Sequence, residues 1–594
     1  MRRELTLSAI LLTTLAIGGA SAIEPTRQPS AETLAALDPT ALGRNACRGF
    51  FISGSTLDAR LQLAQALSDD RGYGARPINL YPDISPSDLP LGEASPMARQ
   101  YFDQGLALAY GFNHRAAIRS FQNAREIDPE CAMCWWGEAM ANGPNINAGM
   151  DDEQNQAALH ALERARQLAV GDDPAVLELI DAQAARYSDD PNADRAALDW
   201  AYAQAMLAIA RENPSNDDLA ILAAEAAMNT SPWDYWDLET GEPRPLLGEA
   251  VSLIEAVMNR SPAHPQASHL YIHLLELPDA QRAEAAADRL RETGPKALGH
   301  LVHMPAHIYY RIGRYRDSMD ANIDAVAADE AYLSEVGDDG LVRFGYYPHN
   351  VHFLLASAQM MGDVRTVATQ TARLEAILDI ETGRDLYWVQ AIYAAPYFAY
   401  AQYGSPAATL SLTADPHELD YVEAMRRYAR AVAHAQSRDA DSFALELEAL
   451  RSFEGSEGAR QLEASGFPAP LIIRLATEVA QGRMAMALDR HRSAISHFSN
   501  AAEMQRAIPY TEPPFWYYPV HQSLGAAYFE AGEFEDAQRA FRAALFNAPN
   551  NALALYGLIQ AERMLGHELE AQAAQQAFDS VWLGDDEWLS MDRI

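Results

Sequence analysis

Half of the histidines in this chain lie in one stretch, and imidazole is the side chain that most often binds metal ions at neutral pH. Eight of the sixteen fall between His264 and His352. Their spacing is H-x4-H-x3-H from His264, H-x2-H-x3-H from His300 and H-x2-H from His349. Residues three or four apart share one face of a helix, so the spacing predicts pairs of metal ligands carried by helices.

The helices that would position these side chains are predicted by a repeat with a period of about 34 residues. In the segment from Tyr518, Gly525 stands at position 8, Ala537 at 20 and Phe541 at 24, and the segment from Ala98 follows the same frame. Small residues at positions 8 and 20 let two helices approach, and the aromatic ring fills the gap between them. The predicted fold class is all-α: an α-solenoid, or superhelix, of tetratricopeptide-like antiparallel helix pairs.

In such repeats the first helix of each pair lines the concave groove. Seven histidines occupy groove-facing positions of three successive pairs, namely His269, His273, His300, His303, His307, His349 and His352. His264 falls just before its helix. Pro305 interrupts the helix between His300 and His307 and is expected to kink it. The repeat frame therefore predicts one histidine-lined surface from helices that are separate in sequence.

Helix geometry suggests two metal sites on this surface. His269 and His273 would face His303 and His307 around one ion, because neighbouring helices pack about 8–10 Å apart. A second site would use His300, His349 and His352, with an open coordination position. The residues expected to contact the ions or their ligands are Glu276, Tyr309 and Tyr310.

Imidazole ligands favour zinc, copper, iron or nickel over magnesium or calcium. In the alternative interpretation, the imidazoles form a polar groove lining that binds a peptide or protein partner without metal. The sequence holds no nucleophile-elbow, zincin, phosphate-loop or dinucleotide-binding motif in a suitable context. A binding scaffold is therefore expected rather than an enzyme, and any catalysis is expected to depend on metal.

The N-terminus predicts export to the periplasm or secretion. Residues 1–22 contain two arginines, an apolar stretch and an A-x-A site, the pattern of a signal peptide. No later apolar stretch has the length of a membrane span. The net charge of −37 argues against nucleic acid and anionic membranes as partners. In an oxidising compartment, Cys131 and Cys134 can form a disulfide.

The chain divides into seven predicted segments. They are the signal peptide at 1–22, an extension and proline-rich strap at 23–97 with one helix near 56–68, repeats at 98–229, an aromatic and proline-rich insertion at 230–247, histidine-rich repeats at 248–379, further helical repeats at 380–474 and C-terminal repeats at 475–594. A second insertion is expected at 329–347. The aromatic run at 513–521 is expected to pack between repeat units, with ligand stacking as the alternative.

Several stretches also carry a resemblance. They are residues 101–106, 112–114, 128–133, 136–137, 143–147, 299–309, 347–353 and 512–516. In these stretches the chain resembles a little-characterised group of exported bacterial tetratricopeptide-repeat proteins with a histidine-rich central region. The resemblance implies a binding scaffold with an α-superhelix, and it supplies no catalytic residue.

Overall fold

A computed structural model describes residues 30, 78–169, 174–237, 239–337 and 340–594. The predicted signal peptide, the predicted helix near 56–68 and most of the predicted extension lie outside these residues. The described part of the strap runs without helix from Ile78 to Ser95 and buries Ile78, Leu89 and Leu91. Its backbone is held by side chains of the folded body, since the Tyr81 N–H donates to Gln104 Oε1 at 2.6 Å.

The described residues form helices joined by short turns, with isolated bridges in place of any β-sheet. The N-terminal helices are α3 (Pro96–Tyr110), α4 (His114–Ile127), α5 (Ala132–Ala141), α6 (Asp152–Leu168), α7 (Pro174–Ala184), α8 (Arg195–Glu212) and α9 (Asp217–Met228). The central helices are α10 (Leu247–Arg260), α11 (Pro265–Leu275), α12 (Glu284–Thr293), α13 (Gly299–His303), α14 (Pro305–Arg311), α15 (Tyr315–Val336), α16 (Tyr347–Met361) and α17 (Val364–Ile377). The C-terminal helices are α18 (Ile380–Asp385), α19 (Val389–Tyr403), α20 (Pro406–Leu412), α21 (Asp420–Gln436), α22 (Ala440–Ser452), α23 (Glu457–Ala464), α24 (Ala469–Ala487), α25 (His491–Gln505), α26 (His521–Glu530), α27 (Phe534–Asn547), α28 (Ala552–Met564) and α29 (Glu568–Val581).

Buried phenylalanines packed on glycines show that the helix pairs are tetratricopeptide-like. Phe541 of α27 is fully buried between Gly525 of α26 and Gly557 of α28. A Cβ at Gly525 would lie 2.8 Å from the Phe541 ring, and a Cβ at Gly557 would lie 2.2 Å from it. Phe121 is held in the same way by Gly105 and Gly137. The predicted positions 8 and 24 therefore make the contacts that join one pair to the next, and the chain is an all-α solenoid.

Replacing Gly557 with alanine should destabilise the C-terminal repeats. Alanine normally stabilises a helix relative to glycine, but here its methyl group would overlap the Phe541 ring. Overpacking of this kind costs about 1–3 kcal/mol, so urea unfolding should show a net loss of stability. Gly455, which has no atom within 4 Å of an added Cβ, is the control. Equal effects of Gly557→Ala and Gly455→Ala would show that the contact is not tight.

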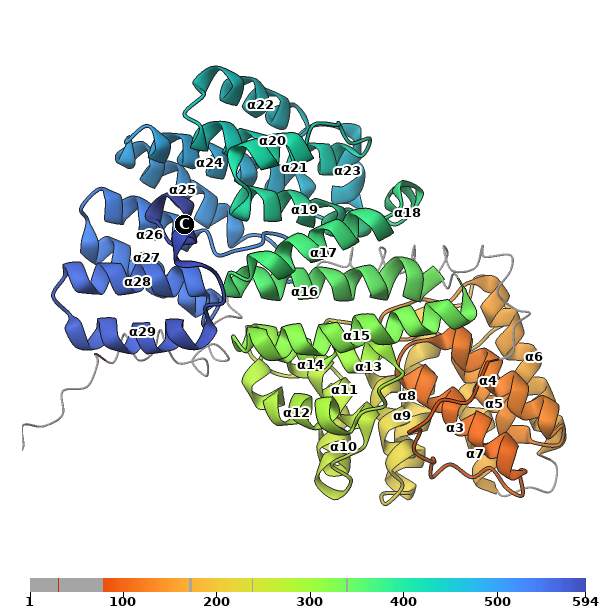
Figure 1. Cartoon of the computed structure of the whole chain (residues 1–594). Coiled ribbons are helices and arrows are strands. Elements are labelled where there is room, and N and C mark those ends of the chain that lie inside the picture. The colour runs from red at the N-terminus through yellow and green to blue at the C-terminus, as the bar shows by residue number, and fades with distance from the viewer. Residues whose placement is uncertain (1–29, 31–77, 170–173, 238, 338–339) are drawn as a thin grey trace, which may run out of the picture.

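The superhelix folds back so that its C-terminal helices meet its centre. In Figure 1, α3 to α15 occupy one half and α16 to α29 the other, with α15 and α16 side by side where the halves meet. The Leu583 N–H donates to the Met361 carbonyl at 2.9 Å. The Asn550 amide donates to the Gly313 carbonyl at 3.2 Å. This closure brings the loop between α25 and α26 next to the central histidine helices.

Pro305 ends the helix that carries His300 and His303, so that α13 and α14 are separate short helices. This agrees with the kink expected from the sequence. The second predicted insertion is largely helical: α15 continues to Val336, and a wide helical turn, η5 (Val342–Tyr346), leads into α16. The remaining short helical turns are η4 (Ala280–Ala283), η6 (Asp586–Trp588) and η7 (Met591–Arg593).

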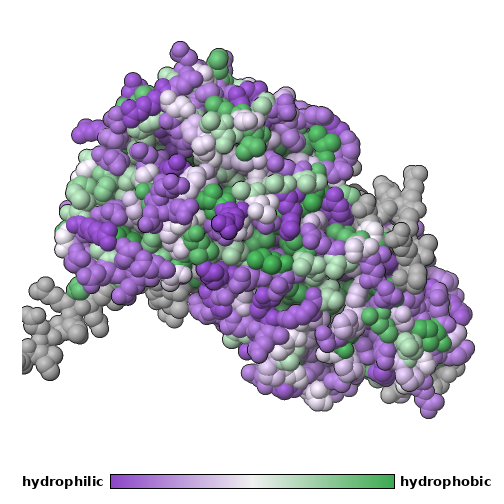
Figure 2. Space-filling model, viewed as in Figure 1, coloured by the Kyte–Doolittle hydropathy of each residue, from purple (hydrophilic) through white to green (hydrophobic). Residues whose placement is uncertain are grey.

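The predicted disulfide between Cys131 and Cys134 is present, and both residues are buried at the start of α5. None of the helices in the described part of the chain combines the length and apolar character that crossing a membrane requires. The face in Figure 2 is mostly hydrophilic, with smaller apolar areas toward its middle. This surface agrees with the strongly acidic composition.

Candidate functional site

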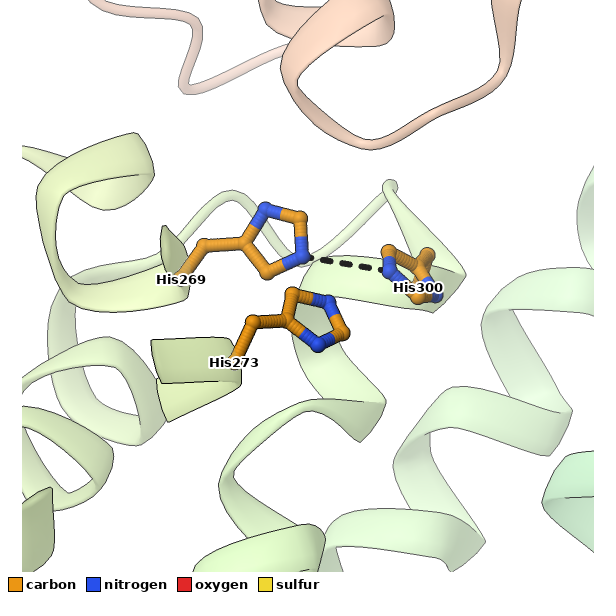
Figure 3. A group of neighbouring side chains, drawn as sticks. All are labelled: His269, His273 and His300. Carbon is orange, nitrogen blue, oxygen red and sulfur yellow. Dashed lines mark hydrogen bonds between the residues drawn. The ribbon is translucent and has the colours of Figure 1, made fainter. Parts of the chain in front are cut away.

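The first histidine group joins two helices. His269 and His273 come from α11 and His300 comes from α13, and their candidate ligand atoms all lie within 4.8 Å of one another. Figure 3 shows the three rings turned toward a common point. The Nε2 atoms of His269 and His300 are 3.2 Å apart. Two nitrogens on one tetrahedral ion at about 2.0–2.1 Å are roughly 3.3 Å apart, so this spacing suits shared coordination.

The second group joins three helices. His303 of α13, His307 of α14 and His349 of α16 also place their candidate ligand atoms within 4.8 Å of one another. His303 Nε2 lies 2.9 Å from His307 Nε2 and 3.2 Å from His349 Nε2. The two groups are neighbours, because ring centroids of His273 and His307 are 6.3 Å apart.

The structure divides the predicted ligands differently from the sequence analysis. His269 and His273 group with His300 rather than with His303 and His307, since the His300 ring of α13 lies against His269 of α11. His352 lines the same cavity but belongs to neither group of three.

The structure places the two predicted supporting tyrosines, Tyr309 and Tyr310, in different surroundings. Tyr310 lines the cavity. Tyr309 donates from its hydroxyl to Asp288 at 2.8 Å and is not among the residues lining the cavity. The Tyr309 hydroxyl is therefore engaged outside the cavity, because adjacent residues of α14 point in different directions. His264, placed before its helix by the sequence, caps the start of α11.

Amide side chains fix the orientation of one histidine in each group. His303 Nδ1 lies 2.7 Å from Asn322 Oδ1, and the Asn322 amide nitrogen donates to the Ser318 carbonyl. The oxygen of Asn322 therefore faces the ring, so Nδ1 carries the proton and Nε2 keeps its lone pair. His269 Nδ1 lies 2.7 Å from Gln266 Oε1 in the same way. In both groups the Nε2 lone pair is directed at the other imidazoles.

A buried carboxylate joins the two groups. Glu276, which is 1% exposed, places Oε1 3.4 Å from His273 Nδ1 and Oε2 2.7 Å from His307 Nδ1. Glu512, from the loop between α25 and α26, places Oε2 3.2 Å from the same His307 nitrogen. Glu276, His307 and Glu512 form a third set of converging candidate ligands. Since Nδ1 of His307 faces the carboxylates, its Nε2 stays directed at His303.

Protonation differs within the site. Burial and neighbouring imidazoles lower the pKa well below the usual value for His269, His300, His303 and His349. Burial also opposes a charge on His307, but Glu276 and Glu512 outweigh it and raise the pKa of His307 to about 10. Burial opposes a charge on Glu276 too, yet His307 and His273 lower its pKa to about 2. Without metal, these four imidazoles are therefore neutral and lie beside one buried ion pair.

The histidines form one wall of a cavity of about 270 Å³. His273, His300, His307 and His349 line it, whereas the fully buried His269 and His303 stand behind them. An ion bound by either group would therefore have its open coordination position directed toward the cavity.

Residues that the sequence analysis did not select complete the wall. Trp233 of the first predicted insertion lines the cavity and donates from its indole N–H to the Ile146 carbonyl at 2.9 Å. Tyr346 of η5 stacks on His300 with ring centroids 4.5 Å apart. Glu512 was noted only within a resembling stretch, and its acidic side chain before two prolines was the available signal.

Comparisons with known proteins assign the chain to no family. No family model matches the chain, and no curated protein matches it. Solved structures with some similarity include the TPR domain of P58(IPK), at 13% identity with a TM-score of 0.20, covering 79% of this chain and 99% of that one. The human IFIT1 dimer with PPP-AAAA shows 10% identity and a TM-score of 0.26, covering 91% and 98%. Naa15/Naa10 bound to HypK-THB shows 13% identity and a TM-score of 0.19, covering 82% and 88%. The repeat assignment therefore depends on the glycine and phenylalanine packing within this chain.

Proposed function

We propose that the chain is an exported tetratricopeptide-like scaffold whose histidine cavity binds two transition-metal ions, for metal handling or metal-dependent chemistry. One observation carries the proposal: in four of the six grouped histidines, Nδ1 lies against a side-chain oxygen while the ring is packed in its group. Metal-binding histidines have this arrangement, since the outer hydrogen bond fixes the tautomer and directs the other nitrogen to the ion.

The spacing of the Nε2 atoms also favours an ion over a polar lining. With its proton on Nδ1, His303 has only a lone pair at Nε2, yet two other Nε2 atoms lie within 3.2 Å of it. The single lone pair at His303 Nε2 accepts one well-aligned hydrogen bond, so N–H groups of His307 and His349 cannot both be satisfied there. A cation at this point would satisfy all three nitrogens at once and replace the proton held by His307.

The ligand set indicates the class of ion. Six imidazoles suit zinc, copper, iron or nickel, and three protein ligands per ion leave a position for water or another small ligand. Glu276 would orient ligands of both ions, because it contacts His273 and His307. Its charge would partly balance the two cations.

Peptide recognition by the histidines is less favoured by the structure. The side chains of His269, His273, His300, His303 and His307 are each at most 8% exposed. A peptide lying in an open groove would need accessible imidazoles. A protein or peptide partner in the concave groove stays a prediction. The disulfide between Cys131 and Cys134 supports the proposal of export, since such bonds persist in oxidising compartments.

Elemental analysis tests the proposal. The full chain, produced without an affinity tag under metal-replete conditions, should carry up to two ions of zinc, copper, iron or nickel per chain. His160 is exposed and outside the site, so His160→Ala should retain the same metal content. The proposal fails if the purified protein contains no such metal and takes up none on titration.

A further inference from the structure

The cavity has an apolar side that metal binding does not explain. Besides the polar histidines and glutamates, the cavity lining includes apolar side chains, namely Leu341, Ala391, Ile392, Ala395 and Phe398. Most of these residues belong to one face of α19, where Ala391, Ala395 and Phe398 are three or four residues apart. An ion-storage site would need no such surface beside it.

Small side chains create this space, and aromatic rings limit it. Ala356 of α16 lines the cavity seven residues after His349, on the same helix face. Phe398 stacks on Tyr517 with ring centroids 4.7 Å apart, so one end of the cavity is a rigid aromatic wall. The single helix α16 thus carries a candidate metal ligand at one end of the cavity lining and an alanine farther along it.

The size and charge of the cavity restrict its occupant. A volume of about 270 Å³ lies just below the range of about 300–1,000 Å³ typical of small-molecule sites, so a folded domain cannot enter. The carboxylates of Glu276 and Glu512 would repel an anion from the empty site, whereas two bound cations would attract one. Tyr310 lines the cavity, and its buried hydroxyl has no hydrogen-bond partner among the described residues.

We infer that the cavity binds a small organic molecule with an oxygen-donor head group, of the carboxylate or hydroxamate type, and a compact apolar body. The head group would occupy the open position of a bound ion, within reach of the Tyr310 hydroxyl. The apolar body would pack against Ala391, Ala395 and Phe398. This inference rests on the proposed metal site and assigns the class of ligand that the site selects.

Two hydroxamates with the same head group separate the contributions of metal and apolar wall. Calorimetric titration of the metal-loaded full chain should show that benzohydroxamate binds about tenfold or more tightly than acetohydroxamate, because only its phenyl ring reaches the apolar wall. Ala391→Phe, which fills the apolar part of the cavity, should abolish this preference at unchanged metal content. Ala356→Leu narrows the same space and serves if the first variant folds poorly. Ala407 is exposed on α20, so Ala407→Phe should keep the preference.

Metal content, measured before and after each titration, distinguishes the two proposals. Stoichiometric metal with equal affinities for both hydroxamates would overturn the inference and leave the metal site standing. A preference for benzohydroxamate that survives both cavity-filling variants would also overturn it, since the ring would then bind elsewhere. Absence of metal would overturn both. Loss of the preference in the filled variants at unchanged metal content would establish the apolar subsite.

Discussion

Replacing His303 with alanine is expected to remove one of the two proposed ions and leave the other in place. His303 Nε2 lies within 3.2 Å of the Nε2 atoms of both His307 and His349. It is therefore the ligand atom that the other two members of the group both approach. Four-ligand zinc sites bind with about 10–16 kcal/mol, or roughly 3 kcal/mol for each ligand, which is about a hundredfold in affinity. Elemental analysis after dialysis should therefore show about one ion fewer per chain.

His269→Ala is the matched variant, because His269 is the fully buried member of the other group. It should also remove one ion, and the double variant should retain none. If His269 and His303 instead shared one ion, as the sequence spacing suggested, each substitution would release that same ion, and the double variant would keep the second ion held by His300, His349 and His352. The two arrangements therefore predict different stoichiometries, and thermal unfolding in chelator would show whether each variant still folds.

The repeat pattern was sufficient to predict the fold because its main contacts involve residue types that sequence reveals. Phe541 packs on Gly525 and Gly557, and a ring can approach a helix so closely only where a side chain is missing. The break at Pro305 followed from the chemistry of proline in the same way. By contrast, the return of the C-terminal helices to the centre depends on small rotations accumulated over many pairs, which no local pattern specifies.

The candidate site was predicted in its residues but not in its grouping. Six of the seven selected histidines converge in two groups, since period and position placed them on one surface. Their division depends on how α13 sits beside α11 after the break at Pro305, which is a tertiary property. Glu512 is about 200 residues away in sequence from His307, and only the closure of the superhelix brings them together. The supporting role of Asn322 is similarly visible only once α15 packs on α13.

Glu276→Gln should produce the largest loss of stability in metal-free protein. The substitution keeps the size of the side chain but removes the nearer of the two carboxylates that face His307. Burial then opposes the positive charge on His307 more strongly than this weakened pairing favours it. Removing one partner of a buried ion pair costs about 3–5 kcal/mol. Urea unfolding in chelator measures this difference. Glu503 is an exposed partner of Arg506, and Glu503→Gln should change stability by less than about 1 kcal/mol.

The pH dependence of that difference identifies its cause. The pKa of His307 is raised from 6.5 to about 10, so its contribution is complete below pH 6.5 and is lost as the pH rises toward 10. The pKa of Glu276 is lowered from 4.5 to about 2, so its contribution is present above pH 4.5 and is lost as the pH falls toward 2. The gap between wild type and Glu276→Gln should therefore be widest between pH 4.5 and 6.5 and should shrink at pH 9 and 10. A gap that stays constant from pH 6 to 10 would mean that Glu276 stabilises the fold by packing and hydrogen bonding rather than through the charge on His307.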